Sequence, residues 1–483
     1  MTHIPLIIVG AGFGGLGLGV RLRQAGIEDF AILERSSDLG GTWSLNTYPG
    51  AACDVPSTLY SYSFAPNPGW SRKYGTQPEI LEYLRSIAST HGVMPHIHYD
   101  TEVEAAVFDE DTSRWNLGTN KGDFTCDVLV GAVGVFAEAK FPDLEGLDSF
   151  EGTQFHTLHW DHEHDLTGER VAVIGTGATA VQVIPEVQRV ASEVIVYQRT
   201  PPWIVPRGDR AITPLKQRVF RALPLVQRAN RTAWYAGIET LGLPGFVSAR
   251  FRFPFEAMAR RHLRRQVPDK DLRRVLTPDY MIGCKRAIFS DDYYPALTQE
   301  NVEVVTAGIR EVRPHSVVTS DGVERPVDTI IVATGFSTRP TFCDNVKGTH
   351  GRSINDLQRD RPQSYLGIAN VGFPNMFTIL GPFGAAGNQS VIFMIEGQIN
   401  YIVDAVSRMR ADGVRRAEIR RDVHDAFVTE VHARAQHGTW LTGGCSTYYT
   451  NDRGENAGLY PNWSFEYRRR TRRWDAESYH VTR

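Results

Sequence analysis

Two stretches of the chain share one pattern of apolar and polar positions. In the first, an entirely apolar run at residues 6–9 leads into a glycine-rich segment at 10–15, and a second apolar run follows at 30–33. Short runs of this kind are typical of parallel strands that are buried on both faces. The residues after the glycines have the spacing of a helix, so the pattern predicts a strand, loop, helix and strand in succession.

The glycine-rich segment of this unit has the spacing G-x-G-x-x-G, which is typical of dinucleotide binding. Gly10 makes the turn, Gly12 lets the backbone approach a pyrophosphate, and Gly15 packs the helix on the strand. Exposed N–H groups at the start of the helix hold the phosphates. Glu34 ends the second run, 19 residues after Gly15, where an acid accepts a hydrogen bond from a ribose 2′-OH. The prediction is a dinucleotide site, and the alternative is a glycine-rich turn in an unrelated α/β protein.

The same unit recurs later in the chain with one informative difference. An apolar run at 171–174 precedes a second loop, and another apolar run follows at 194–197. The second loop consists of Gly175, Thr176, Gly177, Ala178, Thr179 and Ala180. Arg199 stands 19 residues after this loop, where the first unit carries its acid, and Thr200 follows it. Because an arginine pairs with a 2′-phosphate that an acid would repel, the second unit suits NADPH and the first suits FAD. A solvated surface arginine is the alternative for Arg199.

Two further apolar runs, at 127–134 and 328–336, carry a glycine at or next to their last position (Gly134 and Gly335) and mark where the chain crosses between units. We therefore predict an α/β fold with two Rossmann-like dinucleotide-binding domains. An FAD domain is expected at 1–140 and 335–483, with an NADP domain at 141–334 that carries a helical insertion at about 208–280.

Composition adds limits to this prediction. The 483 residues carry a net charge of −3 and are 42% hydrophobic, which is close to the average globular protein and gives no reason to expect a nucleic-acid partner. Five scattered cysteines without a C-x-x-C pair predict reduced thiols and a cytoplasmic protein. We expect no signal peptide and no membrane-spanning helix.

Two long motifs connect the chain to a known family. Phe150, Gly152, His156 and Trp160 follow the pattern F-x-G-x-x-x-H-x-x-x-W, with Asp161 next. The second motif, G-G-x-W-x-x-x-x-(F/Y)-P-G-x-x-x-D, runs from Gly40-Gly41-Thr42-Trp43 through Tyr48-Pro49-Gly50 to Asp54. In both, the chain resembles the type I Baeyer–Villiger monooxygenases, a family of class B flavin-dependent monooxygenases, and the resemblance covers essentially the whole chain.

The resemblance implies a reaction and a set of site residues. NADPH reduces FAD, O2 adds to give a C4a-peroxyflavin, and attack on a ketone yields an ester or lactone. Arg286 in Gly283-Cys284-Lys285-Arg286 is then the catalytic arginine, Asp54 holds it, and Lys285 joins Arg199 and Thr200 at the 2′-phosphate. An arginine suits this role because it keeps its proton and stabilises an anion in a water-poor site. The remaining FAD contacts are expected from Thr42, Trp43, Tyr60, Val103 and Val391.

Other functions are compatible with parts of the sequence. An N- or S-oxygenating flavin monooxygenase needs a protonated oxidant, so the arginine is less useful to it. A disulfide reductase would carry a C-x-x-x-x-C pair after the first unit, which is missing. A non-catalytic redox sensor would not need Arg286. His156 and Trp160 are interpreted mainly as domain-orienting residues, with direct chemistry as the alternative; a zinc site of His156, His159, His162 and His164 lacks an ordered ligand spacing.

Two segments depart from the family pattern or from average composition. Tyr448 stands where the family carries a tryptophan that contacts NADP and substrate, which leaves that contact open. The stretch 207–275 holds 16 Lys or Arg against 5 Asp or Glu, together with several aromatic residues. We interpret it as a helical lid over the active site, with contact to an anionic membrane surface as the alternative.

Overall fold

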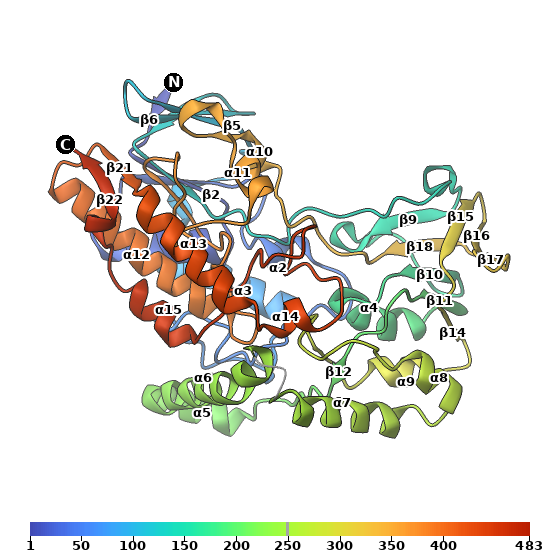
Figure 1. Cartoon of the computed structure of the whole chain (residues 1–483). Helices are drawn as coiled ribbons and strands as arrows, with labels where there is room; N and C mark the ends of the chain where they lie inside the picture. Colours follow the sequence, from blue (N-terminus) through green and yellow to red (C-terminus); the bar gives the residue numbers. More distant parts are fainter. Residues whose placement is uncertain (248–250) are drawn as a thin grey trace.

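The first repeated unit forms a parallel five-stranded sheet in the order β20-β8-β2-β3-β4 (Figure 1). The structure is a computed structural model and describes residues 1–247 and 251–483. Every residue of β2, β3 and β8 is buried, as their apolar composition predicts. The strands are β2 (Leu6–Val9), β3 (Phe30–Leu33), β4 (Ile97–His98), β8 (Val128–Gly131) and β20 (Met376–Thr378).

Helices from both ends of the chain cover this sheet and share its hydrophobic core. The helix after the first glycine loop, α1 (Phe13–Gln24), packs against α12 (Val391–Ala411) and α3 (Gln77–Thr90). The C-terminal part adds α13 (Arg421–Ala435), α14 (Thr439–Thr442), α15 (Ser464–Arg470) and the hairpin of β21 (Arg416–Ile419) with β22 (Tyr479–Thr482). The first and last parts of the chain therefore build one unit.

A second, mixed sheet lies beside the first, in the order β1-β7-β6-β5-β19. Its strands are β1 (Thr2–His3), β5 (Val103–Asp109), β6 (Arg114–Thr119), β7 (Phe124–Cys126) and β19 (Val346–Lys347). The short helix α10 (Phe342–Asn345) packs against β5 of this sheet with α11 (Ile354–Asp360) beside it, whereas α2 (Thr42–Leu45) packs against α3 of the first unit.

The second repeated unit forms another parallel sheet, in the order β14-β11-β10-β18-β9. Its members are β9 (Thr153–His156), β10 (Arg170–Ile174), β11 (Glu193–Tyr197), β14 (Val302–Val305) and β18 (Thr329–Val332). The helices α4 (Ala178–Gln188) and α9 (Tyr293–Leu297) pack together on it, and a small antiparallel sheet follows α9, made of β15 (Ile309–Arg313), β16 (Ser316–Thr319) and β17 (Glu324–Pro326). The α/β fold with two Rossmann-like units is thus the fold that the sequence predicts.

The two connections between the units lie side by side. Ala139 and Phe336 form an antiparallel bridge, and the N–H of Lys140 donates to the carbonyl oxygen of Gly335 at 3.0 Å. Gly335 and Phe336 belong to the second run that the sequence identifies as a crossing, and Ala139 and Lys140 follow the first run by five and six residues.

Among the described residues between β12 (Ile204–Val205) and β13 (Ile288–Phe289), four α-helices lie along one side of the molecule (Figure 1). They are α5 (Pro214–Ala222), α6 (Pro224–Val247), α7 (Phe253–Gln266) and α8 (Lys270–Val275). A buried ion pair links α6 to α12: Arg231 lies 3.7 Å from Glu396, and their side chains are 14% and 4% exposed. The insertion is therefore attached to the first unit as well as to the second.

The insertion also carries large apolar side chains on its surface. Leu215, Leu225, Leu241 and Phe253 are each about 70% exposed, between 69% and 74%. Within the described residues, no helix combines the length and hydropathy that a membrane crossing requires. Peripheral membrane contact and the cytoplasmic location stay predictions, and Arg250 of the basic stretch lies outside the described residues.

The expectation that all five cysteines are reduced is wrong for two of them. Cys284 and Cys445 form a disulfide with their Cα atoms 6.1 Å apart, although 161 residues separate them in the sequence. Cys53 and Cys126 are buried free thiols, and Cys343 is a partly buried one. The scattered spacing of the cysteines carries no information about which of them the fold brings together, so the sequence could not reveal this bond.

Candidate active site

The first glycine loop has no room for side chains at Gly10 and Gly15, two of the three positions of the motif. Gly10 has φ +105°, and a Cβ at Gly15 would lie 1.9 Å from the carbonyl oxygen of Gly10. The carboxylate of Glu34 is buried and accepts a hydrogen bond from the N–H of Ala11 at 2.7 Å. The acid therefore lies directly over the loop, next to Gly12 at the start of α1, which is the arrangement that fits a dinucleotide.

The residues of the second motif lie against this loop. A Cβ on Gly12 would contact Gly41, the residue that precedes Thr42 and α2. The indole N–H of Trp43 donates to the hydroxyl of Tyr60 at 3.2 Å, and both rings are largely buried. Of the other predicted FAD contacts, Val103 begins β5 and Val391 begins α12. Thr42, Trp43 and Tyr60 are thus brought together near the first loop, while the structure places Val103 and Val391 at the ends of separate elements.

The second glycine loop is open at Gly177, where a ligand could approach the backbone. A Cβ on Gly175 would lie 2.5 Å from the carbonyl oxygen of Ala333, whereas nothing lies within 4 Å of a Cβ on Gly177. The hydroxyl of Thr176 donates to the carbonyl oxygen of Thr200 at 2.9 Å, so the loop and the end of β11 are joined. Ala178, Thr179 and Ala180 begin α4, whose first N–H groups point toward the same open side.

Two positive charges meet beyond this loop. The pKa of the Lys285 ammonium is below its ordinary value, because the group is buried and because the positive charge of Arg199 lies nearby. Asp279 acts in the opposite sense but does not cancel these effects. Like charges held together favour a negative ligand between them, as a 2′-phosphate would supply.

Asp54 and Arg286 form a two-point ion pair across the interface of the units. The Nε and Nη2 atoms of Arg286 donate to Oδ2 and Oδ1 of Asp54 at 2.8 Å and 2.7 Å. Burial raises the pKa of the Asp54 carboxyl, but the charge and hydrogen bonds of Arg286 outweigh burial and hold that pKa below its ordinary value. The charge of Asp54 in turn raises the pKa of Arg286 well above its ordinary range. The guanidinium is thus permanently positive and fixed in orientation.

The loop that carries Asp54 is itself held by α4 of the second unit. The hydroxyl of Tyr48 donates to Gln182 at 3.0 Å, and the amide of Gln182 donates to the carbonyl oxygen of Ala52 at 2.8 Å. A Cβ on Gly50 would lie 2.6 Å from the backbone oxygen of Gln182, so only glycine allows this approach. Burial raises the pKa of Tyr48 to about 12, so its hydroxyl stays protonated as a donor. The Tyr-Pro-Gly part of the motif is therefore a contact between the two units.

Comparisons with known proteins agree with this geometry. A family model described as pyridine nucleotide-disulphide oxidoreductase matches residues 7–228. A Baeyer-Villiger monooxygenase of Streptomyces coelicolor is 42% identical over 487 residues, which cover 100% of this chain and 93% of the relative. The chain belongs to the Baeyer–Villiger monooxygenase family.

Solved structures of the same kind match over the whole chain. A steroid monooxygenase bound to NADP is similar with a TM-score of 0.89 and 29% identity, and the match covers 99% of both chains. A complex of OTEMO with FAD and NADP gives a TM-score of 0.89 at 26% identity, also over 99% of both chains. This Baeyer–Villiger monooxygenase is an NADPH-dependent flavoenzyme with FAD and NADP as cofactors, which confirms the enzyme class and the cofactors predicted from the sequence.

Sequence reasoning missed a second guanidinium in the monooxygenase site. Arg207 donates to the carbonyl oxygen of Cys53 at 3.1 Å, and its charge also lowers the pKa of Asp54. Its backbone N–H is held by Asp291 at 3.0 Å. No motif contains Arg207, and only its position in space relates it to the Asp54–Arg286 pair.

Two tyrosines of the C-terminal part also lie near Arg286. Tyr448 and Tyr449 raise the pKa of the guanidinium further, and their hydroxyl groups are 3.3 Å apart. Tyr449 is buried, whereas Tyr448 is 45% exposed and its ring lies 6.1 Å from that of Phe136. The residue that replaces the family tryptophan therefore lies beside the Asp54–Arg286 pair.

His156 lies at the crossing between the units rather than at the ion pair. Its Nε2 pairs with the carbonyl oxygen of Gly335 at 3.0 Å, and its Nδ1 accepts from the N–H of Leu158 at 3.0 Å. Trp160 packs edge-on against Phe155 of β9 with ring centroids 5.0 Å apart. These contacts favour the domain-orienting interpretation of the fingerprint over direct chemistry.

Two of the other histidines of that stretch, His162 and His164, have partners of their own. His162 pairs with the hydroxyl of Thr47 at 2.8 Å, and His164 lies 3.0 Å from Glu169. Within the described residues, no group of three His, Cys, Asp or Glu side chains could hold a metal ion.

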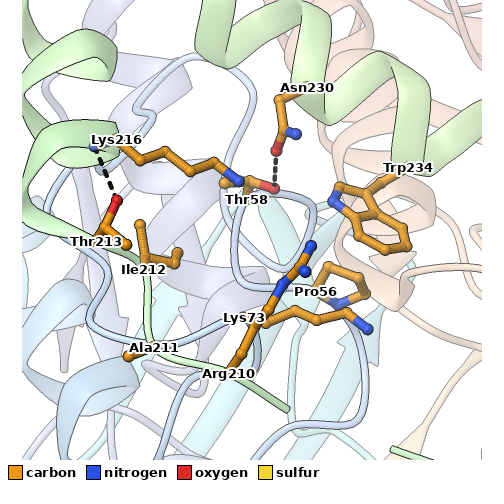
Figure 2. Close-up of a pocket in the computed structure, with 10 residues that line it drawn as sticks. All are labelled: Pro56, Thr58, Lys73, Arg210, Ala211, Ile212, Thr213, Lys216, Asn230 and Trp234. Atoms are coloured by element: carbon orange, nitrogen blue, oxygen red, sulfur yellow. Dashed lines mark hydrogen bonds between the residues drawn. The ribbon is translucent and has the colours of Figure 1, made fainter. Parts of the chain in front are cut away.

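The loop after Asp54 shares a cavity with the insertion, as Figure 2 shows. Its volume is about 250 Å³. Pro56 and Thr58 form one side, and the hydroxyl of Thr58 donates to Asn230 of α6 at 3.1 Å. The remaining lining residues are Lys73, Arg210, Ala211, Ile212, Thr213, Lys216 and Trp234. The basic stretch thus covers part of the loop that carries Asp54, while its role as a lid stays a prediction.

Proposed function

We propose that this Baeyer–Villiger monooxygenase uses NADPH and O2 to insert one oxygen atom next to the carbonyl of a small-molecule ketone, which gives an ester or a lactone. When bound, FAD supplies the transfer of electrons from NADPH to O2. The glycine loops, Glu34 and the Arg199–Lys285 pair are the features of this chain that fit the two cofactors.

The observation that carries this proposal is the two-point pair of Arg286 with Asp54. Oxygen insertion next to a carbonyl passes through negative charge on oxygen, first on the oxidant and then on the tetrahedral adduct. A guanidinium that cannot lose its proton stabilises that charge, and a carboxylate behind it fixes its direction. The pair thereby provides a preorganised positive charge without a proton transfer of its own.

The neighbouring residues support the same chemistry. Arg207 adds a second positive charge near Asp54, which also lowers the pKa of the carboxyl and keeps it ionised. Tyr448 and Tyr449 lie beside Arg286, and Tyr448 donates a hydrogen bond to the hydroxyl of Tyr449. N- or S-oxygenation needs a protonated oxidant and gains less from a fixed cation, so it is not favoured.

We further propose that the FAD domain comprises 1–140 and 335–483 and the NADP domain 141–334. Within them, the FAD contacts are those of the first loop with Glu34, Thr42, Trp43, Asp54, Tyr60, Val103 and Val391. The NADP contacts are residues 175–180 with Arg199, Thr200, Lys285 and Arg286.

The test compares Arg286→Met with Arg218→Met, which removes an exposed guanidinium on α5. Each FAD-loaded protein is mixed with NADPH under anaerobic conditions and then turned over in air with a panel of linear, cyclic, aryl and steroid ketones. We expect both variants to reduce the flavin, and only Arg286→Met to lose ester formation. The ester should carry one ¹⁸O atom when ¹⁸O2 is supplied.

Two results would count against the proposal. Ester formation by Arg286→Met at the parent rate would remove Arg286 from the chemistry. Oxidation of sulfides or amines by the parent protein, with no ester from any ketone, would instead support the heteroatom-oxygenating alternative.

A further inference from the structure

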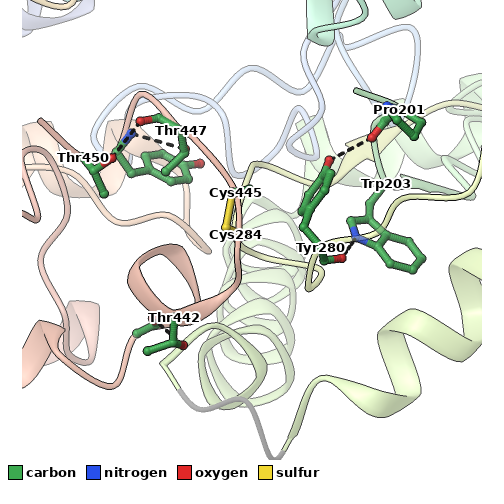
Figure 3. The surroundings of a disulfide bond; sticks show 10 residues. Pro201, Trp203, Tyr280, Cys284, Thr442, Cys445, Thr447 and Thr450 are labelled. Atoms are coloured by element: carbon green, nitrogen blue, oxygen red, sulfur yellow. Dashed lines mark hydrogen bonds between the residues drawn. A yellow bond between two sulfur atoms is a disulfide. The ribbon is translucent and has the colours of Figure 1, made fainter. Parts of the chain in front are cut away.

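The disulfide joins the two segments that meet at the proposed catalytic arginine (Figure 3). Cys284 lies two residues before Arg286, on the stretch between α8 and β13. Cys445 lies three residues before Tyr448, on the C-terminal segment after α14. A covalent bond therefore connects the backbone that carries the guanidinium to the backbone that carries its neighbouring tyrosine.

The segment just before Cys445 packs closely on the arginine stretch. The N–H of Met281 donates to the carbonyl oxygen of Gly443 at 2.9 Å. A Cβ on Gly443 would lie 2.5 Å from the Cβ of Cys284, so only glycine allows the two backbones to approach this closely. Up to Gly443, the contact is therefore built into the fold and does not depend on the disulfide.

The turn from Gly444 to Tyr448 is held differently. The hydroxyl of Thr447 accepts from the N–H of Tyr449, its carbonyl oxygen accepts from Thr450, and the hydroxyl of Tyr448 donates to Tyr449. Among the hydrogen bonds of the described residues, those of this turn stay within 444–450, and Gly444, Ser446 and Tyr448 are exposed. Beyond hydrogen bonds, the ring of Tyr448 lies 6.1 Å from that of Phe136, and the sulfur–sulfur bond is the covalent link between this turn and the arginine stretch.

The two sulfur atoms also differ in how easily a reagent reaches them. Cys284 is fully buried in a cluster with Trp203 and Tyr280, whereas Cys445 is partly exposed. Thiolates attack a disulfide at its accessible sulfur, so exchange begins at Cys445 and releases Cys284 as the leaving thiolate. An accessible sulfur of this kind is the feature that makes a disulfide open to exchange with a thiol.

We propose that Cys284 and Cys445 form a reversible thiol–disulfide site that controls the monooxygenase by tying the Tyr448 turn to the Arg286 stretch; this rests on the proposed function of Arg286. A dithiol reduces the pair: two S–H bonds form on the protein, its S–S bond breaks, and the dithiol becomes a disulfide. Hydrogen peroxide restores it, because two thiols and one peroxide give one disulfide and two molecules of water. Oxidised protein holds the turn in place, and reduced protein releases it.

The release changes oxygenation more than flavin reduction. The turn borders Arg286, where small displacements of a positioned charge have large effects on rate. We expect reduction of the pair to lower ester formation roughly tenfold and to raise the fraction of NADPH that ends as peroxide. The rate of flavin reduction by NADPH in the absence of oxygen should change less than about twofold.

The experiment uses the full FAD-loaded protein in three states: as isolated, after dithiothreitol, and after dithiothreitol followed by hydrogen peroxide. Free thiols are alkylated, and the Cys284–Cys445 peptide pair is followed by mass spectrometry. Cleavage by chymotrypsin after Tyr448 reports the release of the turn, and turnover with a ketone reports its consequence. Cys445→Ser and Cys445→Ala are permanently in the open state, and Cys343→Ser is the matched control with both partners intact.

The proposal expects a linked peptide in the first and third states only, with faster cleavage after Tyr448 and slower oxygenation in the second. Both Cys445 variants should show the cleavage and turnover rates of the reduced parent, and dithiothreitol should not change these rates. Cys343→Ser should respond to dithiothreitol as the parent does. Alkylation of both Cys284 and Cys445 in all three states would overturn the proposal. It would also be overturned if the Cys445 variants had the cleavage and turnover rates of the oxidised parent. If no ketone is oxygenated in any state while linkage and cleavage respond as expected, the proposed function fails and the redox control of the turn stands.

Discussion

A buried histidine at the crossing between the two units should make the stability of this enzyme depend on pH. His156 is 1% exposed, and burial lowers its pKa to about 4 although the carbonyl oxygen of Gly335 acts in the opposite sense. Its two ring nitrogens have different partners: Nε2 donates to Gly335, and Nδ1 accepts from the N–H of Leu158. A neutral ring can donate to one partner and accept from the other. A protonated ring carries a hydrogen on both nitrogens, so its Nδ1–H would face the N–H of Leu158 and the hydrogen bond between them would be lost.

The sign and size of the effect follow from the two pKa values. In the unfolded chain the ring has a pKa of about 6.5, so below that pH the unfolded state binds a proton that the folded state does not. The stability that the neutral His156 ring contributes is therefore present above about pH 6.5 and is lost as the pH falls toward 4. The free energy of unfolding falls by about 2 kcal/mol by pH 5, and by about 3 kcal/mol once the pH is well below 4.

His156→Gln isolates this contribution. The amide of glutamine keeps a donor for Gly335 but leaves the N–H of Leu158 without its acceptor, which costs about 1–3 kcal/mol at pH 7.5. Because glutamine does not titrate, the variant escapes the acid loss, and its deficit relative to the parent should nearly disappear by pH 5. Urea unfolding followed by circular dichroism and flavin fluorescence, at pH 7.5, 6.5, 5.5 and 5.0, measures the difference.

The same series contains its own controls. His424 and His432 also have lowered pKa values through burial, but they are present in both proteins and cancel in the difference. His315→Gln changes an exposed ring and is the matched histidine-to-glutamine control. A deficit of His156→Gln that is equal at pH 7.5 and pH 5.0 would show that His156 is not held neutral, and the reasoning from its partners would be wrong.

Three further predictions concern charges. Asp54→Asn removes the negative charge and leaves one acceptor oxygen for Arg286 where the carboxylate has two. This loss of about 1.5–3 kcal/mol should lower ketone oxygenation roughly ten- to hundredfold in stopped-flow turnover while flavin reduction changes little; an unchanged turnover number would contradict it. Arg199→Ala should raise the KM for NADPH at least about tenfold and leave that for NADH nearly unchanged, and equal effects on both would exclude a 2′-phosphate contact. Glu396→Ala should cost about 3 kcal/mol of urea stability by leaving Arg231 buried without its acid, and Glu396→Gln, which can still accept from Ser63, should cost less; the reverse order would refute the anchor.

The framework of the fold was predictable because its signals are local. Buried parallel strands must be apolar along their whole length, so the runs at 6–9, 30–33 and 171–174 coincide with β2, β3 and β10. The glycine loops are likewise local, since the clash that excludes a side chain at Gly15 involves Gly10 only five residues away. The second sheet was not predicted, because its order depends on pairings between strands that lie far apart in the sequence, such as β5 with β19.

The candidate site was predictable only in part, for a related reason. Asp54 and Arg286 lie 232 residues apart, and their pairing was expected from resemblance, not from spacing. Arg207 belongs to no motif, and nothing local to its sequence distinguishes it from the other arginines of the basic stretch. The disulfide was predicted to be absent, because cysteine spacing says nothing about which side chains the fold brings within bonding distance.

Arg207 and the disulfide, which the sequence did not predict, both lie where separate parts of the chain meet around Arg286. Asp54 comes from the first unit, Arg286 from the second, and Cys445 from the C-terminal part, so the site forms only where the three meet. The contacts that bring them together are side chain to backbone, such as Gln182 to Ala52, or glycine against backbone, as at Gly443. Contacts of this kind are hard to predict from a single sequence, because glycine and glutamine occur in many different structural roles. The chemistry of this monooxygenase can therefore be recognised from its motifs, whereas control over the position of Arg286 depends on packing between units, which is where the proposed thiol–disulfide site acts.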